Sequence, residues 1–205
     1  SQEMVKADNK TSKAVRDFFK QEGEKRFAIT DSQNNISILR IDTDPNFPNR
    51  RIARVQQFVD GVPVFGARAN VLVKQGKDVV RTTGKLSATN AVANIKPIPT
   101  IDWLDALERA IVRYRQDFPQ SSPYKQCNLG SIEIRTCRIA TQLLIFDPAR
   151  VGLKTGVARL AWMVRLDNVV MFLDANDGSL IFRYSDLQSA ATTNRLTYDL
   201  NGEGI

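Results

Sequence analysis

The side chains that most often carry chemistry in proteins are scarce in this 205-residue chain. It contains no histidine and only two cysteines, Cys127 and Cys137. Catalytic zinc is held by about three protein ligands, usually including histidine, and two thiols cannot complete such a site. Asp and Glu are present, but no cluster combines a base, a nucleophile and an orienting group. We therefore expect a chain that is not an enzyme and holds no metal or cofactor.

The formal net charge of +7 at pH 7 predicts a basic surface. Such a surface would suit an acidic partner, either nucleic acid or an acidic protein. The basic residues are spread along the sequence, and the densest spots are Lys25-Arg26 and Arg50-Arg51. Nucleic-acid-binding domains concentrate such residues in one patch or along one helix. No apolar run approaches the roughly 20 residues of a membrane span. We expect neither nucleic acid nor a membrane as partner.

The elements of the first half are indicated by hydrophobic periodicity. Apolar residues at 14, 15, 18 and 19 predict a short helix from Thr11 to Glu22-Gly23, preceded by a frayed polar end. A strand is expected at 36–41 and a proline-rich loop at 44–49. Asp60-Gly61 between two β-rich runs predicts a hairpin, and strands 67–74 and 78–86 follow. The first half is thus one helix and a meander of about four strands.

The second half repeats this plan without repeating the sequence. Residues 87–99, rich in Ala, Asn and Pro, are the expected linker. Thr100 is the expected N-cap of a helix that Pro119 ends, and its Trp–Tyr–Phe stripe is interpreted as core. Strands are expected within 131–146, 157–166, 169–173 and 179–184, with a hairpin turn at 174–178. The predicted fold class is α+β, two lobes with a helix on an antiparallel sheet.

Two stretches resemble modules of known proteins. Gln57, Gly61, Pro63, Val64 and Gly66 in the first hairpin resemble the fungalysin/thermolysin propeptide module. Leu160-Ala161-Trp162, followed by the turn that contains Asp174 and Gly178, resembles the PepSY module. In precursors of the thermolysin family the second module follows the first, and the two matches cover most of residues 11–188 in that order.

The resemblance implies cystatin-like lobes at 1–90 and 91–188 that form the pro-region of a secreted zinc metalloendopeptidase. Such a pro-region acts as an intramolecular chaperone and as an inhibitor that blocks the catalytic cleft until cleavage. Its partner is the cognate catalytic domain, which carries the zinc and lies beyond Ile205. The polar start at Ser1 implies that a secretion signal is absent from this chain.

Residues 189–205 are expected to hold the cleavage segment and the start of the mature enzyme, because residues 194–199 resemble its first strand. The processing segment has small or polar side chains that suit an extended form in a protease cleft. It consists of Ser189, Ala190, Ala191, Thr192, Thr193 and Asn194.

Two other functions were weighed, and the state of the two cysteines stays open. The chain could be a free-standing secreted protease-inhibitor or binding module of paired cystatin-like domains, which the sequence beyond Ile205 would reveal. A hydrolase in its own right lacks the necessary residues. Secretion favours a disulfide between Cys127 and Cys137, whereas one continuous strand over 131–137 would hold them too far apart, unless the chain reverses near Gly130.

Overall fold

The computed structural model describes residues 2–31, 35–119 and 141–185, which form two compact units. Within these ranges, the first unit comprises the chain up to Asn94 together with residues 147–158, and the second comprises the rest. The return of residues 147–158 to the first unit was not expected from the sequence. The segment 189–194 and both cysteines lie outside the described residues.

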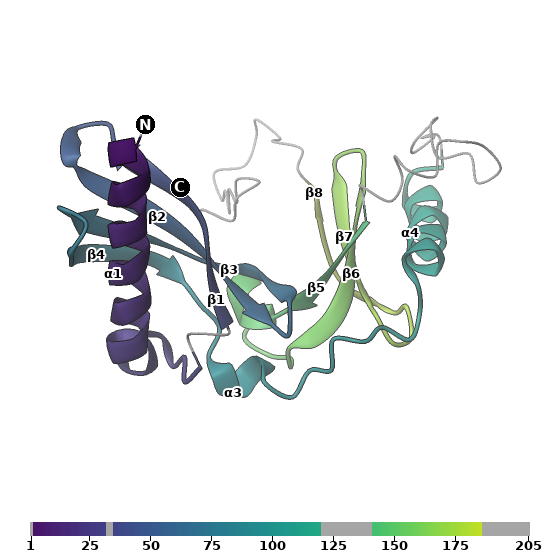
Figure 1. Ribbon diagram of the computed structural model, residues 1–205. Helices are drawn as coiled ribbons and strands as arrows, with labels where there is room; N and C mark the ends of the chain where they lie inside the picture. Colours follow the sequence, from purple (N-terminus) through teal and green to yellow (C-terminus); the bar gives the residue numbers. More distant parts are fainter. Residues whose placement is uncertain (1, 32–34, 120–140, 186–205) are drawn as a thin grey trace. The chain divides into compact units, whose positions relative to one another are not determined.

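The first unit is a helix on a four-stranded antiparallel sheet (Figure 1). Neighbouring strands in the sheet are neighbours in sequence, so the predicted meander is confirmed. Two short helices, α3 and η1, complete the unit. The elements are α1 (Gln2–Phe27), β1 (Ile36–Asp44), β2 (Phe47–Val59), β3 (Val62–Lys74), β4 (Asp78–Lys85), α3 (Thr89–Val92) and η1 (Pro148–Val151).

Helix α1 is longer than its apolar stripe predicted. Gly23 does not end it but belongs to a buried stripe of every fourth residue with Thr11, Val15 and Phe19. The helix ends where Ala28 takes a positive φ of 55° and the Ile29 N–H donates to the Gly23 carbonyl. The Ala28 N–H donates to the Glu24 carbonyl, which is the hydrogen bond of an αL cap, a position that glycine usually fills. An alanine at that position left no sequence signal for the true end.

The core of the first unit lies between α1 and one face of the sheet. Ala67, Ala69, Val71 and Val73 alternate with less buried neighbours along β3, as predicted. The expected loop at 44–49 is shorter than predicted, because β1 and β2 pair up to Asp44 and Phe47. The side chain of Asp44 accepts a hydrogen bond from the Asn46 N–H, which closes the turn.

The second unit has the same plan with α4 (Trp103–Asp117) and strands β5 (Thr141–Phe146), β6 (Arg159–Leu166), β7 (Val169–Asp174) and β8 (Leu180–Ser185). All three strand pairings are antiparallel and sequential. Helix α4 buries Leu107, Ile111 and Tyr114, whereas Phe118 is 42% exposed just past its end. The predicted α+β class is confirmed, with a helix packed on an antiparallel sheet in each unit. Neither α1, α4 nor the shorter described helices could cross a membrane.

The start of α4 differs from the prediction by two residues. Asp102, not Thr100, is the N-cap, and its carboxylate accepts hydrogen bonds from the N–H groups of Leu104 and Asp105. Thr100 instead donates its backbone N–H to the carbonyl of Ala175 in the β7–β8 turn. Both residue types favour N-caps, and tertiary pairing with the turn decided between them.

Candidate functional site

The hairpin motif of the first unit forms the predicted tight turn. Asp60 and Gly61 take φ values of 46° and 82° between the paired residues Val59 and Val62. Positive φ at both central positions is the primed geometry that matches strand twist. Pro63 lies opposite Phe58, beside a bulge, and beyond the last β3–β4 pair at Arg68. It therefore removes no β3–β4 ladder bond.

Gln57 connects this hairpin to the end of β4 through a buried amide. Its side chain is 1% exposed, donates to the Ser87 carbonyl and accepts from the Ser87 N–H, both at 2.8 Å. A buried glutamine is tolerated where both ends of its amide are satisfied. The Gln57 side chain thus makes the two hydrogen bonds that the backbone of a neighbouring strand would otherwise make with Ser87. Ser87 lies where the chain leaves the sheet.

The hydroxyl of Ser87 extends this contact to the segment 147–158. It donates to the carboxylate of Asp147, whose other oxygen accepts from the Ala149 N–H and caps η1. Arg150 lies 3.5 Å from the same carboxylate and donates to the Leu86 carbonyl at 2.9 Å. We call Gln57, Ser87, Asp147 and Arg150 the buried polar cluster. It fixes a distant segment onto the first unit.

Gly66 lies beside this cluster. Its φ is 67°, and a Cβ at this position would lie 3.5 Å from the Cβ of Arg150. The space is therefore sufficient for a methyl group, and the backbone conformation is what favours glycine. Gln57 and Gly66 are both in the propeptide-like motif, and the structure brings both to the cluster that holds residues 147–158.

Gln56, the neighbour of Gln57, is an equally buried residue that the sequence did not single out. Its amide nitrogen donates to the carbonyls of Gln57, Val64 and Ala67, so one of its two hydrogens is shared between two acceptors. Its carbonyl accepts from Arg68 at 2.6 Å. These bonds lie beside the register shift between Gln56 and Phe58, so Gln56 satisfies groups that the bulge leaves out of the ladder. Two adjacent glutamines in a strand were the available signal.

The PepSY-like motif residues lie in the turn between β7 and β8 in the second unit. Asp174 is 7% exposed and accepts from the backbone N–H and the side-chain amide of Asn176. Arg159 lies 3.3 Å from its other oxygen. Asp174 is therefore a turn-capping carboxylate with an ionic partner.

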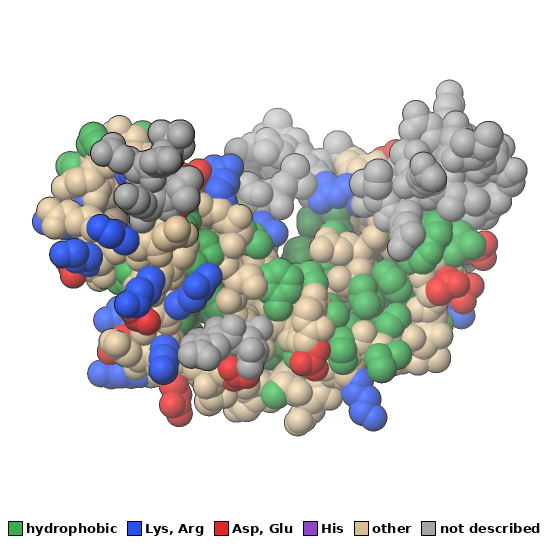
Figure 2. Space-filling model, in the orientation of Figure 1, with side chains coloured by type: hydrophobic (Ala, Val, Ile, Leu, Met, Phe, Trp, Pro, Cys, Tyr) green, Lys and Arg blue, Asp and Glu red, His purple; other side chains and the backbone are tan. Residues whose placement is uncertain are grey.

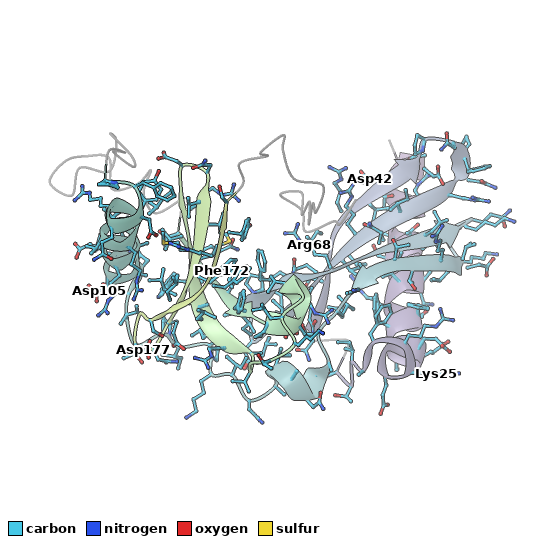
Figure 3. The ribbon with its side chains drawn as sticks, turned by 180° about the vertical axis from the view of Figure 1, so that it is seen from behind. Lys25, Asp42, Arg68, Asp105, Phe172 and Asp177 are labelled. Atoms are coloured by element: carbon cyan, nitrogen blue, oxygen red, sulfur yellow. The ribbon has the colours of Figure 1, made fainter. Side chains whose placement is uncertain are left out.

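Gly178 has a φ of 72°, and a Cβ there would lie 2.6 Å from the Cδ of Arg109 in α4. The guanidinium of Arg109 donates to the carbonyl of Asp177 at 3.2 Å. Figure 3 labels Asp177 in this turn and Asp105 on α4. The hydrogen bonds that Ser179 donates, with the nearby Arg159 and Arg109 charges, lower the pKa of Asp177.

The other face of the second sheet carries an aromatic cluster. The rings of Phe146, Phe172, Phe182 and Tyr184 have centroids 4.8 to 6.2 Å apart. Phe172 alternates along β7 with Met171, whose partner Arg183 pairs with Asp117 at the end of α4. The cluster therefore lies on the face away from α4, around the labelled Phe172 (Figure 3).

Within residues 2–31, 35–119 and 141–185, no three His, Cys, Asp or Glu side chains gather closely enough to hold a metal ion. The motif residues instead form two separate arrangements of hydrogen bonds, one in each unit. Asp147 and Arg150 complete the buried polar cluster of the first unit. The sequence analysis did not find them, because they lie far from the hairpin in sequence. Their only local signal was an Asp-Pro pair typical of a helix start.

Comparisons with known proteins add one structural likeness. No protein-family model matches the sequence, and no curated protein is significantly similar to it. Among solved structures, the Bacillus megaterium YpeB C-terminal domain is similar, with 12% sequence identity and a TM-score of 0.35. The match covers 88% of this chain and 64% of that chain, so this chain spans less than two thirds of its length. Function therefore has to be inferred from the residues and geometry above.

Proposed function

We propose that this chain is the pro-region of a secreted zinc metalloendopeptidase of the thermolysin type. It would assist folding of the catalytic domain and block its cleft until it is cleaved. The observation that carries this proposal is the position of the two motifs, in order, at fold-determining turns of two successive helix-on-sheet units. Gln57 and Gly66 lie at the buried polar cluster, and Asp174 and Gly178 form the β7–β8 turn.

A hairpin held in one conformation suits the role of a folding template. A partner that binds only the native enzyme stabilises it by mass action, and attachment in one chain raises the effective concentration. The buried hydrogen bonds of Gln57 and Gln56 hold the hairpin in one conformation. In this proposal the zinc and its ligands belong to the catalytic domain, and this chain contributes binding surface and the processing segment from Ser189 to Asn194.

The first test is the reading frame beyond Ile205, which should encode a catalytic domain with a His-Glu-x-x-His zinc helix. That domain, unfolded in denaturant and diluted into zinc-containing buffer, should regain several-fold more peptidase activity when this chain is present. A frame without a peptidase domain would contradict the proposal and favour the free-standing inhibitor. Activity recovery that is the same with and without the chain would contradict the chaperone role.

Inhibition is tested separately with the native catalytic domain. The full chain added in trans should inhibit stoichiometrically, and truncation after Asp186 should keep most of the binding but relieve much of the inhibition. The matured enzyme should begin within or just after the segment from Ser189 to Asn194. Equal inhibition by the truncated chain would show that this tail is a passive linker and that the two units block the cleft.

A further inference from the structure

The sheet of the first unit gathers basic residues on the face opposite α1. In a pleated strand, side chains two residues apart share a face. The register pairs Arg40 with Arg54, Gln56 with Arg68, and Arg68 with Lys85. These residues alternate with Val55, Ala69 and Val71, which are buried in the core toward α1. Figure 3 shows Asp42 and Arg68 on the side of the sheet away from α1.

We define the basic face by this register. It carries seven basic side chains and two carboxylates, a net formal charge of +5, whereas the whole chain carries +7. Its charged members are Arg40, Arg50, Arg54, Arg68, Lys74, Arg81, Lys85, Asp42 and Asp78.

Among the described residues that the register places on this face, carboxylates are fewer than basic groups. Asp42 lies 2.8 Å from Arg40 and 3.4 Å from Arg54, so one carboxylate serves two guanidinium groups. Neighbouring strands lie about 4.8 Å apart, so basic groups on adjacent strands lie within one Debye length of each other at about 0.1 M salt, and those on all four strands do so at low salt. Their potentials therefore add, and the face attracts anionic groups.

The face is accessible and has an apolar centre. The side chains of Arg40 and Arg54 are 64% and 40% exposed, and Lys74, Arg81 and Lys85 are exposed as well. Ile52 and Leu72 pair across β2 and β3 and are half-buried. A small apolar centre with arginines around it is the layout of a protein docking surface, since arginine binds carboxylates in a planar, two-pronged geometry.

Nucleic acid fits this face less well. Surfaces that bind single strands combine basic groups with aromatic rings on which bases stack. The strand segments that form the face, 40–42, 50–56, 68–74 and 81–85, contain no aromatic residue. The nearby ring of Phe47 is already covered by the guanidinium of Arg50, which lies 3.9 Å from the ring centroid. We propose that the basic face docks an acidic polypeptide segment or surface through its Asp and Glu carboxylates. The proposal rests on the face itself and does not require the pro-region function.

The experiment measures binding of fluorescently labelled poly-L-glutamate to the full chain by fluorescence anisotropy at low salt. The face variant combines Arg40→Gln, Arg81→Gln and Lys85→Gln. The control variant combines Lys10→Gln, Lys13→Gln and Lys20→Gln, which removes the same charge from exposed positions of α1. Basic and acidic side chains are interspersed over α1 in Figure 2, so this surface should attract polyanions less. Circular dichroism should show that both variants fold.

We expect the face variant to bind poly-L-glutamate about tenfold more weakly, and the control variant to change by less than about twofold. Equal weakening in both variants would mean that only net charge matters and would overturn the proposal. Undetectable binding by the unchanged protein would also overturn it. Tighter binding of a DNA oligonucleotide of matched charge, lost in the face variant, would assign the face to nucleic acid instead.

Discussion

At the scale of single residues, Gln57 shows how one buried amide can hold a segment that has no strand partner. Both of its hydrogen bonds go to Ser87, which in turn contacts Asp147. The sequence resemblance drew attention to Gln57 without giving a reason for it. The reason is long-range, because Ser87 lies 30 residues further along the chain.

Gln57→Leu should lower the free energy of unfolding of the first unit by about 2–4 kcal/mol, because the N–H and carbonyl of Ser87 would be left unsatisfied in the interior. Both tryptophans, Trp103 and Trp162, lie in the second unit, whereas the longest described helix, α1, lies in the first. The midpoint of chemical unfolding should therefore fall further when it is followed by far-UV circular dichroism than when it is followed by tryptophan fluorescence. Gln21→Leu, at an exposed site of α1, is the control and should change stability by less than about 0.5 kcal/mol.

Two glycines of the first unit differ in why a side chain would be unfavourable. At Gly61 only the positive φ opposes a side chain, whereas at Gly84 a neighbouring atom also blocks it. Gly61 has a φ of 82°, and a Cβ added there would meet no atom within 4 Å. A Cβ on Gly84, at a φ of 105°, would lie 2.3 Å from the Arg68 carbonyl oxygen. Gly61→Ala should lower the free energy of unfolding by about 1 kcal/mol, because alanine is strained at this positive φ. Gly84→Ala should cost more than about 2 kcal/mol, since the β3–β4 pairing must also shift. Equal losses in thermal or chemical unfolding would contradict the clash.

At the scale of elements, the two helices illustrate which boundaries are local. The apolar stripes predicted that both helices exist and which faces they bury. The ends were decided by capping groups, an alanine in an αL cap for α1 and Asp102 for α4. At α4 both Thr100 and Asp102 were chemically able to cap, and the pairing of Thr100 with Ala175 in the β7–β8 turn left the cap to Asp102.

Asp102→Ala should destabilise the second unit by about 1 kcal/mol, because two N–H groups at the start of α4 lose their acceptor. Thr100→Ala is the matched test of the sequence-based prediction. It should cost less, since the Thr100 hydroxyl makes only a long, exposed hydrogen bond of 3.3 Å to Asn176. Tryptophan fluorescence follows this unit. A larger loss from Thr100→Ala would contradict the observed cap.

At the scale of the whole molecule, the first unit is completed by a segment that follows β5 in sequence. Residues 147–158 supply Asp147 and Arg150 to the buried polar cluster. A cut in the expected linker, residues 87–99, would therefore separate the first unit from part of its own structure. Ser87 and Val92 within that linker are also buried.

A fragment of residues 1–94 should consequently be less stable than the same residues in the full chain, although it holds α1 and all four strands of its sheet. Adding residues 95–205 in trans should restore circular dichroism and raise the unfolding midpoint. Asp147→Ala in the added fragment should weaken that recovery, because Ser87 and η1 would lose their acceptor. A fragment 1–94 as stable as the full chain would show that the segment is dispensable.

The sequence by itself determined the parts of this protein that depend on near neighbours. Periods of two and about four residues specify strands and helices, and Asp60-Gly61 specifies a turn, because side-chain direction and positive φ are local properties. Only the tertiary structure decided which residues meet across the sheet. Register placed Arg40, Arg54, Arg68 and Lys85 on one face, although they are scattered in sequence. The tertiary structure also brought Ser87 to Asp147, since contact between distant segments depends on how whole elements pack.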